Sequence, residues 1–496
     1  MARWKNTAVV RVPLLGRLLI ASVVAASACA RTSTPSTAPQ LAITGGLIFD
    51  GTGAPPAPGD VLIRDGKIEA VRSPGAIPAD YQRLDARGRF VMPGLIDAHT
   101  HMLRAGSCGR EEGVAWENLR QIPLNFDVAL AHGTTTVVDL GGPLRGVVAM
   151  RERLRTQREP APRYLVAGPL LTAPNGYPLD WAPRAMAVGL EMVEEIDSAA
   201  RARAVVGRLA QAGVDMVKIA SMDVSYNGRA LPVMSLETFR AVVGAAHARS
   251  LRVFVHAHTA DGYQKAVDGG ADVIAHSSFE PLSDAVVAEV ARRQIPVIPT
   301  LWVFAAFGYA RQHPEYLEEL RPQLLPRWLA RLADFDRRMR AAGDTLPDDF
   351  LPDLHFSRLG SAMQTARDNL ARLSAAGARF AFGTDTSFCY ALHGSAAHEI
   401  GAMVDAGLSP TTALVAATSG SAATFGAADL GVLRAGAAAD VLVLRGNPLE
   451  DLGVLARPDA VIAAGRIVDT AVGPPRVLRT FGVLQTLVRA LYLGAA

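Results

Sequence analysis

The fold is decided by the stretch Val91-Met92-Pro93-Gly94-Leu95-Ile96-Asp97-Ala98-His99-Thr100-His101, an apolar run that ends in two histidines. Residues i and i+2 of a β-strand point to the same face, so His99 and His101 present their imidazoles side by side. Two neutral imidazoles aimed at one point make half of a site for a divalent metal ion. The stretch therefore predicts a buried strand whose carboxyl end carries metal ligands.

Apolar strands alternate with amphipathic helices from this stretch onward. The strand candidates are Val91–His99, Thr134–Leu140, Tyr164–Leu171, Met216–Ser221, Arg252–His258, Asp272–His276, Ile295–Leu301 and Arg379–Asp385. Such alternation is typical of a parallel sheet, and this number of repeats suits a barrel. We therefore expect the α/β class and a (β/α)8 TIM barrel, whose functional residues lie at the carboxyl ends of the strands.

Short β-runs separated by turns occur near both ends of the chain, for example Val61–Arg64 and Ala460–Arg466. The simplest interpretation is one small composite β-sandwich domain built from both chain ends. The expected organisation is a signal peptide (1–28), a linker (29–39), an amino-terminal β-sandwich segment (40–92), the TIM barrel (93–428), a carboxy-terminal β-sandwich segment (429–470) and a C-terminal amphipathic helix (471–496).

The first residues have the pattern of a secretory signal. A basic start is followed by the apolar run Leu18–Ala26, and Ala26-Ser27-Ala28 precedes Cys29. A small-x-small site of this kind predicts cleavage and export, to the periplasm or to an anchored position at the cell envelope. Cys29 directly after that site also resembles a lipoprotein cleavage site, so a membrane tether through a lipidated Cys29 stays open.

Charge is nearly balanced, with 50 Lys+Arg against 47 Asp+Glu, and no block of like charge indicates nucleic acid as a partner. Lysine occurs only at positions 5, 67, 218 and 265. Lys218 lies within the apolar run Met216–Ser221, where an unpaired ammonium costs several kcal/mol. Two interpretations stay open: an ion pair with a buried carboxylate, or a neutral lysine that has reacted with carbon dioxide. The resulting carbamate would offer two oxygens, able to bridge two metal ions.

Further polar residues follow the other strand candidates. His256 and His258 repeat the i, i+2 spacing, His276 ends the next candidate, and Asp385 ends the last one. Each of them alone is more often a core or loop residue. Their conjunction with His99, His101 and Lys218 at the strand ends of one barrel predicts a metal centre.

At these residues the chain resembles the amidohydrolase superfamily, in its imidazolonepropionase-like and prolidase-like branch. The resemblance spans roughly Gln40 to Thr470 and rests on the stretch quoted above, His256-Ala257-His258, Thr384-Asp385 and Gly436-Ala437-Ala438-Ala439-Asp440-Val441. It implies the metal ligands His99, His101, Lys218, His256, His276 and Asp385.

The resemblance also implies Zn²⁺, as two ions bridged by carbamylated Lys218, with other divalent metals open. Asp385 would move the proton of a metal-activated hydroxide, and His258 would face the substrate. Some dipeptidase relatives carry a tyrosine where Met234 stands here, which weakens the case for a dipeptide substrate.

The predicted function is that of a metal-dependent amidohydrolase, which cleaves an amide or other C–N bond of a peptide, N-acyl amino acid or cyclic amide. One alternative is a mononuclear deaminase or an imidazolonepropionase-like cyclic-amide hydrolase, which Lys218 disfavours. Another is a non-catalytic binding protein of the cell envelope, since fold does not settle function. The expected partner is a small molecule, and homo-oligomer formation stays open.

Overall fold

The computed structural model describes residues 40–104, 115–157, 160–180, 191–342, 356–386 and 388–471, with isolated positions at 182 and between 482 and 490. The predicted signal peptide and linker, including Cys29, lie outside the described residues, as does most of the predicted C-terminal helix. Within the described part of the chain, no helix is long and apolar enough to cross a membrane.

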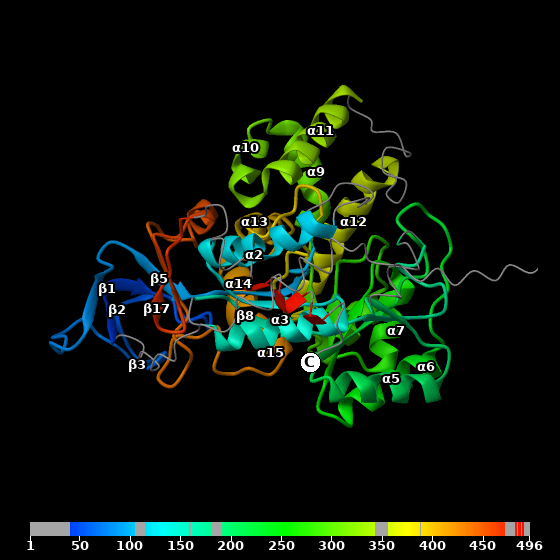
Figure 1. Ribbon diagram of the computed structural model, residues 1–496, viewed down its shortest axis with the longest axis horizontal. Helices are drawn as coiled ribbons and strands as arrows, with labels where there is room; N and C mark the ends of the chain where they lie inside the picture. Colours follow the sequence, from blue (N-terminus) through cyan, green and yellow to red (C-terminus); the bar gives the residue numbers. More distant parts are fainter. Residues whose placement is uncertain are drawn as a thin grey trace, which may run out of the picture. The chain divides into compact units, whose positions relative to one another are not determined.

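Both ends of the described chain contribute to one eight-stranded sheet, here called the composite sheet (Figure 1). Its strands are β1 (Leu41–Ile48), β2 (Ala57–Arg64), β3 (Lys67–Arg72), β4 (Gln82–Asp85), β5 (Phe90–Pro93), β15 (Val441–Leu444), β16 (Ala460–Ala463) and β17 (Arg466–Ile467). The two contributions meet where β5 pairs antiparallel with β15, with Val91 opposite Val443. Their alternating apolar residues bury one core, which includes Ile63 and Ile462.

The region between these strands contains parallel strands in two hydrogen-bonded groups. They are β6 (Leu95–Thr100), β7 (Thr134–Asp139) and β8 (Arg163–Val166), and β9 (Leu170–Thr172), β10 (Val193–Glu195), β11 (Met216–Ala220), β12 (Arg252–His256), β13 (Val273–Ala275) and β14 (Val297–Ile298). The amide of Asp215 donates to the carbonyl of Val166 at 2.8 Å and so links the two groups. The structure is therefore α/β, with a parallel-strand region and a separate composite sheet.

Three strand candidates differ from expectation. The first one divides at Gly94 into β5 of the composite sheet and β6 of the parallel-strand region. A Cβ on Gly94 would lie 2.2 Å from the Thr135 hydroxyl, so the chain changes sheets where only glycine fits. The candidate Tyr164–Leu171 is likewise two strands, β8 and β9. The segment Arg379–Asp385 contains no assigned strand, although Phe380 forms a parallel bridge with Val297.

Helices cover the outside of the parallel strands, as their amphipathic patterns predict. They include α2 (Ala115–Ala131), α3 (Leu144–Thr156), α5 (Ala199–Gln211), α6 (Leu236–His247), α7 (Ala260–Gly269), α8 (Asp284–Arg292), α13 (Ala396–Asp405), α14 (Pro410–Val415) and α15 (Ser421–Thr424). Side-chain oxygens of Ser198, Ser235, Thr259 and Ser283 cap the amino ends of α5 to α8. Each of these helices therefore begins at a position that its sequence specifies.

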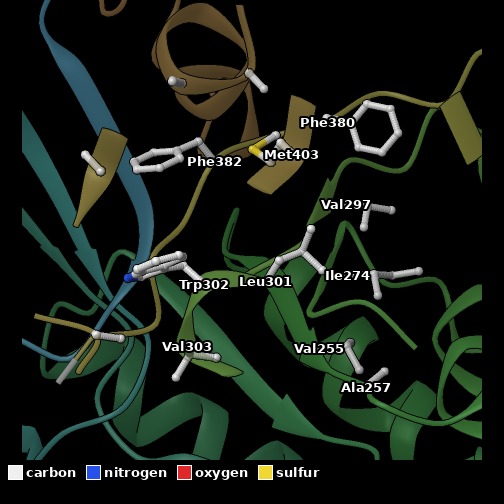
Figure 2. Close-up of a cluster of buried hydrophobic side chains, with 14 of the residues drawn as sticks. Val255, Ala257, Ile274, Val297, Leu301, Trp302, Val303, Phe380, Phe382 and Met403 are labelled. Carbon is white, nitrogen blue, oxygen red and sulfur yellow. The ribbon is translucent and has the colours of Figure 1, made fainter. Parts of the chain in front are cut away.

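Strand residues alternate between two apolar layers. Figure 2 shows residues of one of them, in which Val297 lies on the side of Phe380, Ile274 lies beside Leu301, and Val255 lies beside Ala257. The other layer contains Met216 of β11 and Phe254 of β12. Because the side-chain period of a strand is two, Lys218 and His256 point to the same side as that second layer. The polar residues thus sit at the carboxyl ends of strands that are otherwise apolar.

A long helical insertion follows β14. It contains α9 (Trp302–Gln312), α10 (Tyr316–Leu320), the 3-10 turn η2 (Arg321–Gln323), α11 (Pro326–Ala341) and α12 (Phe356–Ala375). The start of α9 borders the strand ends, because Phe304 lies 5.7 Å from His258 between ring centroids. The insertion thus contributes a side chain at the same place as the predicted metal ligands.

Candidate metal centre

The structure brings the six predicted ligands together at the carboxyl ends of the parallel strands. The Asp385 carboxylate lies 3.1 Å from His101 Nε2, 3.5 Å from His99 Nε2 and 3.8 Å from His276 Nδ1. Lys218 Nζ lies 3.4 Å from His99 Nε2. Residues from distant parts of the sequence thus converge on one small volume, although their assignment as ligands stays a prediction.

Two groups of donors in this cluster have spacings that suit a metal ion. His256, His258 and His276 form one group, and His99, His276 and Asp385 form the other, each with ligand atoms within 4.8 Å of one another. His276 belongs to both groups. The predicted substrate-facing residue, His258, therefore lies as close to its neighbours as the predicted ligand His256 does.

Backbone features hold the side chains in this arrangement. His276 and Asp385 have positive φ angles of 79° and 50°, which non-glycine residues rarely adopt. Gly383 lets its segment lie against β6, because a Cβ there would approach that of His99 to 2.6 Å. The Asp385 amide then donates to the His99 carbonyl at 2.7 Å. Strained residues of this kind concentrate at functional sites.

Burial favours the neutral form of several basic groups of the centre. It lowers the pKa of Lys218 to about 7 and that of His258 to about 4. The pKa values of His99, His256 and His276 also fall well below their ordinary range, chiefly through burial. Neutral imidazoles and a neutral amine offer lone pairs, which is the protonation state that metal binding or carbamate formation needs.

Two buried nitrogens of the centre lack a partner, which fits a cation. His258 Nε2 and His276 Nε2 are buried and form no hydrogen bond among the described residues. Buried polar atoms are seldom left unsatisfied, because this costs about 1–3 kcal/mol each. His258 Nδ1 faces the Ser277 carbonyl at 3.1 Å, so its Nε2 keeps the free lone pair. The donor set therefore fits a divalent metal ion.

Two buried carboxylates, Asp97 and Asp139, lie next to the histidines of the centre and hold the backbone and side chains around them. Asp97 accepts the amides of His99 and Thr384 at 3.1 Å each, and it accepts the Thr384 hydroxyl at 2.5 Å. It thereby ties β6 to the segment that carries Asp385, and burial raises its pKa to about 7. Asp139 accepts the Tyr164 hydroxyl at 2.7 Å and lies 3.9 Å from His101 Nδ1. Asp97 and Asp139 are not among the predicted site residues.

Aromatic rings form one side of the centre, and sequence reasoning missed them. Tyr177 stacks on His256 with 4.3 Å between ring centroids. Tyr226, Phe279 and Phe304 surround His258 at 5.3, 4.6 and 5.7 Å. Tyr226 lies in the segment between β11 and α6, the same segment as Met234. The segment therefore does carry a tyrosine beside the site, eight positions before Met234 in the chain.

Known proteins resemble this chain in both sequence and structure. A family model described as the amidohydrolase family matches residues 90–468. A deacetylase of Agrobacterium fabrum is 42% identical over 90 residues, which is 16% of this chain and 22% of that protein. The match thus spans under a quarter of that relative's length.

Two solved structures align over nearly their whole length. A protein from Bifidobacterium longum, provisionally described as a prolidase, is 28% identical with a TM-score of 0.68 and covers 91% of this chain and 100% of its own. An Xaa-Pro dipeptidase with bound methionine is 22% identical with a TM-score of 0.69, covering 87% of this chain and 100% of its own. Such neighbours imply a TIM-barrel-like fold with an additional domain.

Proposed function

The chain belongs to the amidohydrolase family and is a hydrolase of C–N bonds, and we propose that its substrate is a small peptide or N-acyl amino acid with an apolar group next to the cleaved amide. The observation that carries this proposal is the convergence of Asp385, Lys218 and the buried neutral histidines on one volume lined by aromatic rings. A cyclic amide fits the same chemistry and belongs in the test.

The family is metal-dependent, and we propose that this chain holds two Zn²⁺ ions. His99, His101, His256, His276 and Asp385 would be ligands, with Lys218 as a bridge after carbamylation. When bound, the ions supply a Lewis acid that lowers the pKa of water and polarises the substrate carbonyl. The Lys218 amine, with a pKa near 7 from burial, attacks carbon dioxide and releases one proton to form the carbamate.

Asp385 would then transfer the proton, and His258 and Tyr226 would contact the substrate. Asp385 lies among the imidazoles with 19% of its side chain exposed, so it can take a proton from water and hand it to the leaving nitrogen. His258 Nε2 has no partner among the described residues and is free to contact the substrate. The Tyr226 phenol is hydrogen-bonded to Tyr177, and burial raises its pKa, so it keeps a proton that it would redirect from Tyr177 to a developing oxyanion.

The substrate class follows from what surrounds His258. Tyr226, Phe279 and Phe304 offer apolar ring faces, which favour an aromatic or branched apolar side chain. The named neighbours include an Xaa-Pro dipeptidase and a deacetylase.

We also propose that the parallel strands close into an eight-stranded barrel, with 379–385 as its last strand. Support comes from the Ala98 amide, which donates to the Phe382 carbonyl at 2.9 Å, and from the Ala381 amide, which donates to Val297 at 3.0 Å. An experimental structure in which 379–385 lies apart from β6 would contradict this closure.

Export to the cell envelope is a further proposal, based on the signal-like residues 1–28. Mass spectrometry of the chain expressed with its own amino terminus tests it. Cleavage before Cys29, with or without added lipid, supports export, whereas an intact Met1 contradicts it.

Turnover of a substrate panel tests the proposed function. Purified protein supplied with Zn²⁺ would be offered apolar dipeptides, N-acyl amino acids, cyclic amides and aminopurines. We expect hydrolysis of apolar dipeptides or N-acyl amino acids, and turnover slower by about 10³-fold or more in Asp385→Asn. Release of ammonia from aminopurines without amide cleavage would instead establish the deaminase alternative.

A further inference from the structure

A cavity lies at the end of the parallel strands that is opposite to the metal centre. Its volume is about 650 Å³, within the range of small-molecule sites. Arg252, which lines it, is the first residue of β12, and His256 of the metal centre is the last residue of the same strand. At about 3.3 Å per residue the two ends are roughly 13 Å apart, so the cavity is separate from the metal centre.

Two arginines that line the cavity, Arg252 and Arg379, have N–H groups that form no hydrogen bond among the described residues. Arg252 donates through one terminal nitrogen to the Ala423 carbonyl at 3.1 Å, and Arg379 donates through Nε to Gln294 at 2.8 Å. Both acceptors are neutral, and neither arginine forms an ion pair within the described ranges of the chain. Each of these exposed guanidinium groups thus has one neutral hydrogen-bond partner and further N–H groups that a ligand could accept from.

The other charged groups of the cavity are already engaged. Arg293 is paired with Glu289 at 2.5 Å. The Asp272 carboxylate accepts the Val253 amide at 2.7 Å and faces His247 Nε2 at 2.8 Å. Arg252 and Arg379 therefore give the cavity a positive character that Asp272 does not cancel.

Apolar residues complete the lining. Ile295 and Leu430 are 5% and 6% exposed, and Val432 is half-buried. These residues come from the loop before β14 and from the segment that leads from α15 back to the composite sheet. The cavity therefore combines a cationic wall with an apolar wall.

We propose that this cavity binds a small organic anion. A carboxylate or phosphate headgroup would accept hydrogen bonds from Arg252 and Arg379, since guanidinium groups match both anions in geometry. An apolar body would lie against Ile295 and Leu430. The ligand would bridge the strand ends and the segment that joins them to the composite sheet.

Isothermal titration calorimetry on the full-length, metal-loaded protein tests this site. The probes are phenyl phosphate, phenylacetate and inorganic phosphate, of which the last lacks an apolar body. We expect phenyl phosphate or phenylacetate to bind at least about tenfold more tightly than inorganic phosphate. The tighter of the two aromatic probes identifies the preferred headgroup.

Variants distinguish binding at this cavity from binding at the metal centre and from a non-specific effect of the protein's positive charge. Arg252→Gln and Arg379→Gln should each weaken binding by about tenfold or more, because a charge-assisted hydrogen bond is lost. Arg203→Gln, at an exposed position on α5, is the matched control and should change binding less than about twofold. Circular dichroism checks that all three variants fold.

Three results would overturn the proposal: no binding of any probe, equal weakening by Arg203→Gln, or binding that the Arg252 and Arg379 variants leave unchanged. The last result would place the probes elsewhere, for instance at the metal centre.

Discussion

The composite sheet and the metal centre bury different kinds of side chain. In the sheet, Ile63, Val441 and Ile462 are fully buried, and folding alone explains them. In the centre, Lys218 and His276 are 2% and 1% exposed, and His276 Nε2 has no hydrogen-bond partner among the described residues. Burial of such groups costs free energy unless a ligand satisfies them. One region is therefore built for stability and the other for a ligand.

The largest effect should come from Asp385→Asn, which removes the proposed proton carrier and keeps its size. We expect kcat to fall by about 10³-fold or more, with little change in the free energy of unfolding. Steady-state kinetics and urea unfolding measure the two quantities. Asp405→Asn, at an exposed position in α13, should keep full activity. If Asp385→Asn kept more than about a tenth of the wild-type activity, Asp385 would not be the proton carrier of the reaction.

The opposite result is expected in the composite sheet. Ile462→Ala deletes a fully buried side chain and should lower the free energy of unfolding by about 2–5 kcal/mol. The kcat of the folded enzyme should stay unchanged. Ile467→Ala is the matched control, because that side chain is 42% exposed and its loss should cost little. A large drop in kcat for Ile462→Ala would contradict the claim that the composite sheet contributes to stability and not to catalysis.

A smaller effect on catalysis is expected at the aromatic side of the centre. Tyr226→Phe removes only the hydroxyl, so kcat/KM should fall by about tenfold through loss of one hydrogen bond in the transition state. Metal content should be unchanged. Tyr316→Phe is a comparison variant, because the Tyr316 hydroxyl donates to the Tyr390 carbonyl at 3.0 Å within the protein. That variant should lose stability and keep its kinetics; the reverse outcome would argue against Tyr226 as a substrate contact.

The smallest effect concerns the pH dependence of stability at the border of the centre. Glu399 is fully buried, accepts the amides of Leu301 and Trp302, and has a pKa raised by burial from 4.5 to about 8. The folded state holds a proton that the unfolded chain releases, so raising the pH through this window lowers the free energy of unfolding.

Glu399→Gln should remove that dependence, so its stability should fall less than that of wild type between about pH 5 and pH 8. The difference should reach at least about 1 kcal/mol, measured by urea unfolding at several pH values. Glu237→Gln, at an exposed site in α6, should follow wild type. Parallel behaviour of wild type and Glu399→Gln would show that Glu399 is ionised when folded.

The α/β class could be predicted from the alternation of apolar strands with amphipathic helices, and the family from the resemblance of its motifs. The candidate site could be predicted because strand-end polar residues stand out against apolar runs. Lys218 and the HxH pairs were recognisable for this reason. The same reasoning applied to Asp97, a carboxylate within an apolar strand, would have identified the group that ties β6 to Thr384. Asp97 lies within the stretch 91–101 quoted above, so its role could have been predicted from the sequence.

Other features depend on contacts that a sequence does not display. Tyr226 and Phe304 reach His258 from two separate segments, and nothing in their local pattern distinguishes them from core aromatics. The division of the first strand candidate at Gly94 depends on the Thr135 side chain of the neighbouring strand. Hydrophobic periodicity can predict where a strand or helix lies in the sequence. It does not predict which side chains from other segments that strand or helix will contact.

Metal content measured on wild type beside Lys218→Ala is the decisive test of the proposed two-metal centre. Elemental analysis of wild type should give about two metal ions per chain, with fewer than about one in Lys218→Ala. Lys265→Ala, a half-buried lysine on α7, is the control and should match wild type. About one metal ion in all three proteins would contradict the carbamate-bridged centre, make Lys218 structural and favour the mononuclear alternative.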